Sequence, residues 1–496
     1  MDEKPVKILE ISGASWMGGI SVYPYIPTGG LFQQATNYDP FDKVGVFIPN
    51  RAPGAVDTDD INVSLRFMVT YSTGGTNFVV GFANSSKAFS INVTTEAATD
   101  VSAQISDIAT VRGVTKYKGR VVYASDDSVK SNLLPLAIGN QVGLLSLSTA
   151  GHIMHVAPDR NLYITNKDKI ARIVDVATVG SVNNSNSFLT FESDVITRGL
   201  TDDGQYLIIV GDTNTVTPST TLENNRCFVA FWNMQSQNLT RIWSFTDSHI
   251  SGVISQEDNV IVIGATHTYI CNINSRPTIL IPSTGNASLT QSSPQPGAIL
   301  KRHNGTAIWG TGASMRGYGR LHLSLPLTLF TGYTVPVSTE TILSVIDVSN
   351  PGGQFFSLWA STDGNKLFNF GSFSAEVASI ATAGITFDQP YKFAFVKVIL
   401  NDNLASGQAV DIEIKTGDGD QIVMKSTRGQ ANSFSFANFG AKKSHIFYPF
   451  PDTNDAGNSS ETFEDLTDFK VINTGASIRK VEVWGYPIPP DQDNYL

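Results

Sequence analysis

The feature of this sequence that most constrains its fold is a repeat built around polar turns. The stretch "ITRGLTDDGQYLIIVGDT" (196–213) reads as an extended run, a tight turn at Asp202-Asp203-Gly204 and a continuous apolar strand. The stretch "ISGVISQEDNVIVIGAT" (250–266) nearly superimposes on it, because both have a strand, a polar turn, four or five apolar residues and then Gly. Two extended runs joined by such a turn predict a β-hairpin.

The same pattern recurs along the chain. Fainter copies occur at 111–125, 152–166 and 298–312, and two outer candidates lie at 66–84 and 357–373. The turn centres Gly74, Lys118, Asp159, Asp203, Glu257, Asn304 and Asp363 give spacings of 44, 41, 44, 54, 47 and 59 residues. A period of about 40–50 residues made of short strands is typical of a β-propeller, whose small sheets cover their faces by packing in a ring. We therefore expect an all-β chain with six or seven degenerate blades.

The two clearest copies also contain the later strands of a blade. "QYLIIVGD" is followed by "RCFVAFWNMQ" and "LTRIWSF", and "NVIVIGA" is followed by "HTYICNIN" and "RPTILIP". Each of these units therefore offers four strands, the number expected of one blade.

Acidic pairs are the only hint of hydrolytic chemistry, and they have a structural explanation. The pairs are Asp59-Asp60, Asp126-Asp127 and Asp202-Asp203. Asp is favoured in turns because its carboxylate accepts hydrogen bonds from nearby backbone N–H groups. Turns equivalent to Asp202-Asp203 hold Lys-Gly, Asp-Arg, Glu-Asp and Asn-Gly, which share turn aptitude and no chemistry. A polysaccharide-degrading enzyme is kept as an alternative, since active sites can assemble from residues distant in sequence.

From about residue 380 the strands become longer and alternate regularly. In "AVDIEIKT" (409–416) the apolar side chains should face one way and the charged ones the other, as in a half-buried strand. "YKFAFVKVIL" (391–400) and several later runs predict a small, jelly-roll-like β-sandwich. "GDGD" (417–420) is interpreted as a hairpin turn and not as a calcium loop, because the EF-hand spacing is not met.

These patterns divide the chain into an N-terminal arm or blade-closing segment (1–55), a β-propeller (56–380), a C-terminal β-sandwich (381–490) and a solvated tail (491–496). The first segment is rich in Gly, Pro and Tyr and has no sustained periodicity, so it either packs over another surface or pairs with the last blade. Its aromatic residues Tyr38, Phe41 and Phe47 would be costly to leave in water, so we expect them to dock.

Several partners are disfavoured by composition. The net charge is −10 and the basic residues are scattered singly, whereas a nucleic-acid binder needs a concentrated basic face. No apolar run approaches the roughly 20 residues that span a bilayer. The start "MDEKPVKILEISGAS" lacks the apolar core of a signal peptide, so we expect a protein made and kept in solution.

Motifs for catalysis, cofactors and metals are missing from the sequence. No phosphate-cradling loop, dinucleotide fingerprint or nucleophile elbow occurs in a suitable context. The two cysteines, Cys227 and Cys271, lie in apolar strand-like runs and supply neither a disulfide framework nor a metal site. His152 and His155 should lie on opposite faces of a strand. We therefore expect no enzyme, no cofactor and no metal.

The Gly- and Tyr-rich opening with "LFQQATNYDPFDKVGVF", the degenerate blades and the ending "KFAFVKVILNDNLASGQAVDIEIKTGDGD…IRKVEVWGYPIP" together resemble the propeller-containing virion proteins of tailed bacteriophages. The resemblance implies a structural part of the tail or neck, assembled into the virion in the host cytoplasm. Its expected partners are other virion proteins and copies of itself, in a ring or spike, with no nucleic acid and no membrane insertion.

The main alternative is a receptor- or glycan-binding module for host attachment. Tyr448, Trp484 and Tyr486 could stack on sugar faces, because aromatic rings bury apolar surface while keeping a polar edge. Aromatic residues near strand ends are also common in cores, so the sequence leaves both readings open.

Overall fold

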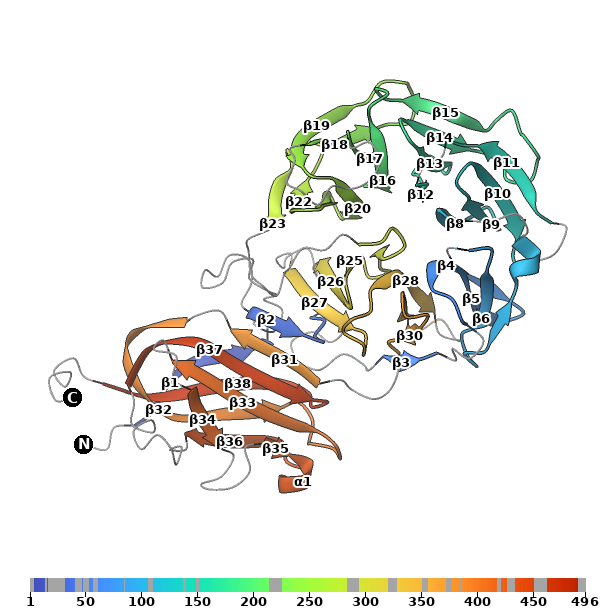
Figure 1. Cartoon of the computed structure of the whole chain (residues 1–496). Coiled ribbons are helices and arrows are strands. Elements are labelled where there is room, and N and C mark those ends of the chain that lie inside the picture. Colours follow the sequence, from blue (N-terminus) through green and yellow to red (C-terminus); the bar gives the residue numbers. More distant parts are fainter. Residues whose placement is uncertain are drawn as a thin grey trace.

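The computed structural model is all-β and has two parts, a ring of small sheets and a larger sheet at its side (Figure 1). It describes residues 4–13, 16, 32–40, 47, 53–56, 61–83, 85–105, 110–136, 140–148, 151–213, 225–282, 294–319, 328–349, 356–371, 377–382, 385–416, 421–425, 433–449 and 462–488. Within these residues there are seven four-stranded antiparallel sheets and one ten-stranded sheet.

The first four small sheets follow one another along the chain. Their strands are β4 (Leu65–Thr73), β5 (Thr76–Ala83), β6 (Ala88–Asn92) and β7 (Ala98–Asp100); β8 (Gly113–Tyr117), β9 (Arg120–Ala124), β10 (Ser128–Leu133) and β11 (Val142–Ser146); β12 (Met154–Val156), β13 (Leu162–Asn166), β14 (Lys169–Ile173) and β15 (Ser185–Thr190); and β16 (Ile196–Asp202), β17 (Leu207–Asp212), β18 (Asn225–Trp232) and β19 (Arg241–Asp247).

The next three small sheets complete the ring. Their strands are β20 (Ile250–Gln256), β21 (Asn259–Gly264), β22 (Thr268–Cys271) and β23 (Thr278–Ile281); β24 (Ile299–Lys301), β25 (Ala307–Thr311), β26 (Ser314–Gly319) and β27 (Thr328–Thr334); and β28 (Ile342–Ser349), β29 (Phe356–Thr362), β30 (Leu367–Asn369) and β3 (Gly54–Ala55). The first strand of each sheet contacts the first strand of the next, and β28 of the last sheet contacts β4 of the first. The ring is thus propeller-like, as the repeat predicts.

The turns of the repeat are formed as hairpins. Residues in the left-handed backbone region, at positive φ, occur in the turns after β4, β8, β12, β16, β20 and β24. In the turn that follows β16, Asp202 Oδ1 accepts from the N–H of Gly204 (2.8 Å), and Asp203 Oδ1 accepts from the N–H groups of Gln205 (3.0 Å) and Tyr206 (2.7 Å). The turn interpretation of this pair is therefore confirmed.

The seventh copy of the repeat was aligned on the wrong turn. Asp363 lies between β29 and β30, the second and third strands of its sheet, whereas the other six centres lie between first and second strands. The sequence "STDGNKLF" has the same turn chemistry as the first hairpins of the other sheets, so composition cannot tell the two turns apart. This offset lengthened the last apparent spacing to 59 residues.

The N-terminal segment closes the ring. β3 pairs with β30 through Gly54 opposite Asn369 and Ala55 opposite Phe368, and the N–H of Val56 donates to the carbonyl of Leu367 (2.9 Å). The last sheet therefore takes its fourth strand from the start of the chain. Part of the N-terminal segment thus pairs with the last blade.

The ten-stranded sheet combines both ends of the chain. Its order is β1-β38-β32-β36-β34-β33-β37-β31-β2, β35 pairs with β33, and β32 also pairs with β37. These strands are β1 (Val6–Ser12), β2 (Phe32–Thr36), β31 (Val377–Thr382), β32 (Ile385–Leu400), β33 (Ala409–Thr416), β34 (Gln421–Lys425), β35 (Ser433–Ser435), β36 (Ser444–Pro449), β37 (Thr462–Thr474) and β38 (Ile478–Pro487), with a short helix α1 (Phe436–Phe439) after β35. After the ring, the chain re-enters this sheet at β31, which starts at Val377, four residues before the boundary predicted at 381. Residues 491–496 lie outside the described chain.

The alternation predicted for β33 is confirmed. Val410, Ile412 and Ile414 are buried, whereas Asp411 and Glu413 are partly exposed. Burial raises the pKa of Asp411. β33 and β34 pair antiparallel, and the predicted turn "GDGD" between them lies outside the described residues.

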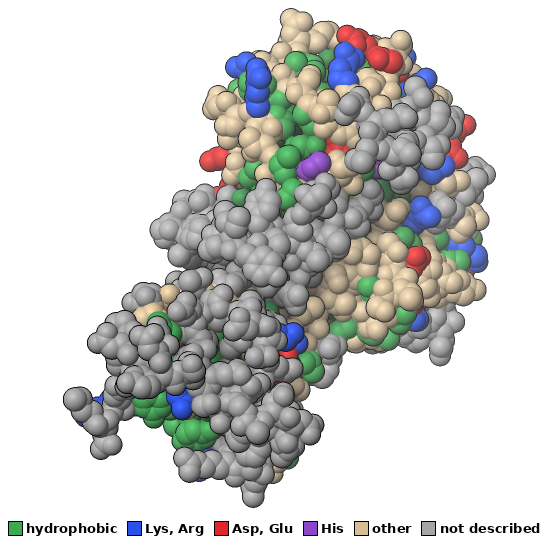
Figure 2. Space-filling model, turned by 60° about the vertical axis from the view of Figure 1, so that its left-hand side comes forward, with side chains coloured by type: hydrophobic (Ala, Val, Ile, Leu, Met, Phe, Trp, Pro, Cys, Tyr) green, Lys and Arg blue, Asp and Glu red, His purple; other side chains and the backbone are tan. Residues whose placement is uncertain are grey.

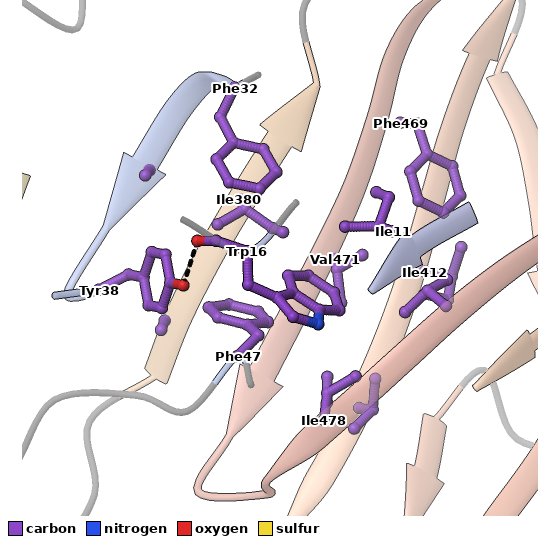
Figure 3. Close-up of a cluster of buried hydrophobic side chains, with 14 of the residues drawn as sticks. Ile11, Trp16, Phe32, Tyr38, Phe47, Ile380, Ile412, Phe469, Val471 and Ile478 are labelled. Carbon is purple, nitrogen blue, oxygen red and sulfur yellow. Dashed lines mark hydrogen bonds between the residues drawn. The ribbon is translucent and has the colours of Figure 1, made fainter. Parts of the chain in front are cut away.

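The described aromatic residues of the N-terminal segment lie inside this chain (Figure 3). Trp16, Tyr38 and Phe47 are at most 2% exposed; Phe47 stacks on Trp16 and meets Tyr38 edge to face, with ring centroids 5.7 and 5.1 Å apart. The hydroxyl of Tyr38 donates to the carbonyl of Trp16. Phe47 also forms a backbone bridge to Ile478 at the start of β38. Tyr38 and Phe47 therefore dock within their own chain, where the C-terminal sheet covers them; Phe41 lies outside the described residues.

A buried ion pair connects the same segment to the ring. Arg302, just after β24, donates from Nη1 to Asp39 Oδ2 (3.3 Å) and to Tyr333 Oη (3.0 Å), and from Nε to Asp347 Oδ1 (3.2 Å). The hydroxyl of Tyr333 also donates to Asp39 Oδ2 (2.8 Å). Burial lowers the pKa of Arg302, but Tyr333, Asp39 and Asp347 more than offset this and raise it overall.

The inner strands approach so closely that some positions require glycine. A Cβ on Gly113 of β8 would lie 1.8 Å from the carbonyl oxygen of His152, in the segment leading to the next sheet. A Cβ on Gly297, just before β24, would lie 2.0 Å from the carbonyl oxygen of Arg66 in β4. Because the obstructing atoms belong to the backbone, they cannot move aside as a flexible side chain can.

We predict that Gly113→Ala destabilises the protein by about 1–3 kcal/mol, the usual cost of overpacking a close contact. Gly143→Ala in β11 is the matched control, since a Cβ there meets nothing within 4 Å. Chemical denaturation of both variants measures the effect. Equal midpoints for the two would contradict the proposed close approach.

We also predict that Asp39→Asn destabilises the protein by about 2–3 kcal/mol, because hydrogen bonds to charged groups contribute about 1.5–3 kcal/mol and Arg302 stays buried. Glu192→Gln is the control: it removes the exposed ion pair between Glu192 and Arg226 (2.6 Å) and should change little. The two variants are compared by urea unfolding. Similar losses would show that Asp39 contributes no more than a surface charge.

Candidate functional site

One candidate site in the ring is its axial channel. A cavity of about 380 Å³ is lined by the first strands of all seven sheets, together with Pro296 and Gly297. Enclosed cavities with a few convergent polar groups are the usual position of small-ligand sites. The titratable groups among the described lining residues are His155, Arg198, Asp202 and Lys301.

The charged groups of the channel are already paired, Arg198 with the buried Asp212 of β17 (3.2 Å) and the others with groups of the channel itself. His155 at the centre of β12 hydrogen-bonds through Nε2 to Asp202 Oδ2 at the end of β16 (2.5 Å). Lys301 at the end of β24 donates to Ser255 Oγ (3.3 Å), and Thr201 Oγ1 donates to the same oxygen (3.3 Å). These contacts link the third to sixth sheets through their inner strands.

Asp202 is ionised near neutral pH. Burial raises the pKa of its carboxyl, but the hydrogen bond and charge of His155 and the N–H of Gly204 outweigh burial and lower it overall. Asp202 therefore serves two structural purposes, since one oxygen caps the turn and the other bridges to the neighbouring sheet.

The channel carries one carboxylate, one imidazole and two basic side chains among its described lining residues. Asp202 is the only carboxylate among its described lining residues, whereas glycoside hydrolysis ordinarily uses a pair. Ser255 is 1% exposed and bonded on both sides. Burial raises the pKa of both cysteine thiols to about 12, so neither is a nucleophile at neutral pH.

The remaining sequence candidates have separate partners. His152 is buried and hydrogen-bonds the carbonyls of Thr165 (2.8 Å) and Asp126 (3.0 Å). It therefore shares no partner with His155, which bonds to Asp202. Arg112 pairs with Asp126 (2.5 Å), and Asp59-Asp60 lies outside the described residues. In the part of the chain that the structure describes, no three His, Cys, Asp or Glu side chains group as metal ligands, and no helix is long and apolar enough to cross a membrane.

The C-terminal sheet brings two of the predicted aromatic residues together. Trp484 of β38 and Tyr448 of β36 flank Phe395 of β32, with ring centroids 5.5 and 6.5 Å from that of Phe395. Tyr448 is 38% exposed, and the other two are partly exposed. Tyr486 is also partly exposed, two residues along β38 from Trp484. The three rings Trp484, Phe395 and Tyr448 are called the aromatic row below.

Phe395 was missed because a β-bulge shifts the alternation of its strand. Phe393 is opposite Gly485 and Phe395 is opposite Trp484, so two steps on β32 match one step on β38. A regular strand would place both phenylalanines on one face. Instead Phe393 is buried and Phe395 is partly exposed. Nothing in "YKFAFVKVIL" indicates where this shift occurs.

Charged side chains do not gather on the surface seen in Figure 2. Among the described residues of that face, blue and red side chains are scattered in small groups. This agrees with the low proportion of charged residues, 16%.

No family model matches this chain, and no curated protein matches it. Among solved structures it is similar to the computationally designed Ika8 protein (TM-score 0.41, 11% identity, 64% of this chain and 99% of that one). It is also similar to the WD40 β-propeller domain of Doa1 (0.42, 11%, 65% and 97%) and to BBS1N in complex with ARL6DN (0.42, 11%, 64% and 96%).

We predict that the Asp202–His155 contact contributes about 1–2 kcal/mol of stability at neutral pH. Because the folded-state pKa of Asp202 lies below its ordinary value, this contribution is present above that value and is lost as pH falls through the lowered pKa. Denaturation of wild type and Asp202→Asn from pH 7 to pH 2 should therefore give a stability difference that shrinks below about pH 4. A difference independent of pH would contradict the ionised pair.

Proposed function

We propose that the protein is a non-enzymatic structural component of a bacteriophage virion, a tail or neck module that packs against neighbouring virion proteins and copies of itself. The main support is the way its N-terminal segment joins the ring to the C-terminal sheet. This segment gives β1 and β2 to the sheet and β3 to the ring, and Asp39 meets Arg302 at their junction. Two parts joined by a segment that gives strands to both, and by a buried ion pair, form a stiff unit, as expected of a structural component of a virion.

The chemistry of the channel also supports a role without catalysis. Its polar side chains bond mainly to one another and tie adjacent sheets together. Catalytic groups, in contrast, usually keep a hydrogen-bonding position free for the substrate. We infer that these contacts stiffen the ring.

We further propose that the ten-stranded sheet folds into a jelly-roll-like β-sandwich. The support is its pairing order, in which the path β32-β36-β34-β33-β37 returns to β32. A sheet that returns to its own first strand encloses an apolar interior, here including Val396, Ile412 and Phe447.

The virion assignment is tested on particles. Antibodies against the full chain are used to label particles purified by density gradient from lysates that contain the protein. We expect label at the tail or neck and a fixed copy number per particle by quantitative mass spectrometry. A protein recovered only in the particle-free fraction would show that it is not a virion component.

A further inference from the structure

The outward face of the C-terminal sheet has an ordered arrangement of side chains. Directly opposite residues of antiparallel strands share a face. Trp484 is opposite Lys7 on β1 and Phe395 on β32, and Tyr448 of β36 continues the row beyond Phe395. The aromatic row therefore crosses three adjacent strands, β38, β32 and β36, at a right angle to them.

A polar row runs beside the aromatic row. Glu482 is opposite Glu10 on β1 and Lys397 on β32. Glu482 and Lys397 are each two residues along their strand from Trp484 and Phe395, so they lie on the same face as the aromatic row. The two glutamates are bridged by Lys480, which lies 3.0 Å from Glu10 and 2.7 Å from Glu482, and Lys7 pairs with Glu10. The indole N–H of Trp484 donates to Glu482 Oε2 (3.3 Å), so the two rows are connected.

The charges of the polar row are nearly balanced. Hydrogen bonds from Lys7, Ser12 and Lys480 lower the pKa of Glu10 to about 2. Burial raises the pKa of Glu482, but Lys480 and Trp484 outweigh it and lower it overall. Both carboxylates are therefore ionised near neutral pH and offset Lys7 and Lys480. Lys397, opposite Glu482, and Lys392, opposite Tyr486, are further ammonium groups on this face and leave it with a small positive excess.

We propose that this face binds an oligosaccharide made of hexopyranose units. The apolar faces of sugar rings match the partly exposed aromatic rings, and their hydroxyl groups match the exposed or partly exposed Lys7, Glu10 and Lys397 beside them, whereas Glu482 is buried. The rings of Phe395 and Trp484 are stacked, with planes 22° and centroids 5.5 Å apart, and the ring of Tyr448 is tilted by 60° to that of Phe395 with centroids 6.5 Å apart. The rings stand on strands that are each paired on both sides, so little ordering is needed on binding.

A protein partner fits this face less well than a sugar. A stable protein interface buries about 800 Å² per partner around a hydrophobic centre. Here an apolar strip one residue wide is bordered by four ionised side chains that already pair with each other. The inference does not depend on the virion assignment, because it concerns the isolated chain.

Binding is tested on the purified full-length chain with a panel of neutral and uronate-containing hexose tetrasaccharides. Saturation-transfer NMR and titration at up to millimolar sugar provide the readout. We expect binding by wild type, a roughly two- to tenfold weaker affinity for Tyr448→Ala, as one aromatic contact implies, and a larger loss for Trp484→Ala. Phe356→Ala is the matched control, because Phe356 is 42% exposed and stacks on His303 in the ring. It should bind as wild type does.

Lys397→Gln distinguishes the sugar classes. It should weaken uronate binding more than neutral binding, and it keeps the test valid if an aromatic variant fails to fold, as judged by thermal unfolding. Absence of binding to every tetrasaccharide by folded wild type would overturn the proposal. So would binding that neither Tyr448→Ala nor Lys397→Gln alters, or a self-association that Tyr448→Ala abolishes without any sugar binding.

Discussion

Closure of the ring by the N-terminal segment is the constraint on which the rest of the structure depends. Each small sheet is apolar on both faces and is covered mainly by its neighbours, so the seventh sheet must be completed and must pack against the first. Its fourth strand, β3, has only two residues and two paired positions. Such a strand cannot hold by its own hydrogen bonds. It is held because Val56 beyond it enters the core between the seventh and first sheets, and because the chain before it is fixed in the C-terminal sheet.

The same segment explains why the two parts of the molecule share an interior. Residues between β1 and β3 carry Trp16, Tyr38 and Phe47 into the C-terminal core, and that core is continuous with the one between the fifth and sixth small sheets. Asp39 adds a charge beside Tyr38, and the buried Arg302 of the ring compensates it. A buried charge is tolerated only with a well-placed partner. The ion pair therefore favours one relative placement of ring and sheet over others that hydrophobic contact alone would permit.

Much of the ring could be predicted from local turn and strand chemistry, whereas the pairing of strands distant in sequence could not be predicted. Six of the seven assumed turn centres fall between the first and second strands of a sheet, because hairpin turns impose a residue preference that a sequence displays directly. The strands of the fourth and fifth sheets and the alternation of β33 follow from apolar patterning alone. The destination of the N-terminal segment could not be found this way, since β1 and β38 meet across almost the whole chain length. Phe395 was hidden for another reason: a bulge changes the face of a residue without changing its neighbours in sequence.

The channel and the polar row of the C-terminal sheet differ in the hydrogen-bonding capacity that their side chains retain for a ligand. In the channel, His155 and Asp202 bond to each other, and Lys301 and Thr201 both donate to Ser255, so a ligand would have to break a contact that also holds two sheets together. On the C-terminal sheet the ion pairs lie beside the aromatic row and can accept or donate further hydrogen bonds without being broken, because each carboxylate has several acceptor positions. The backbone below that row is already paired on both sides. Recognition at the sheet thus leaves the fold intact, whereas recognition in the channel would act against ring closure.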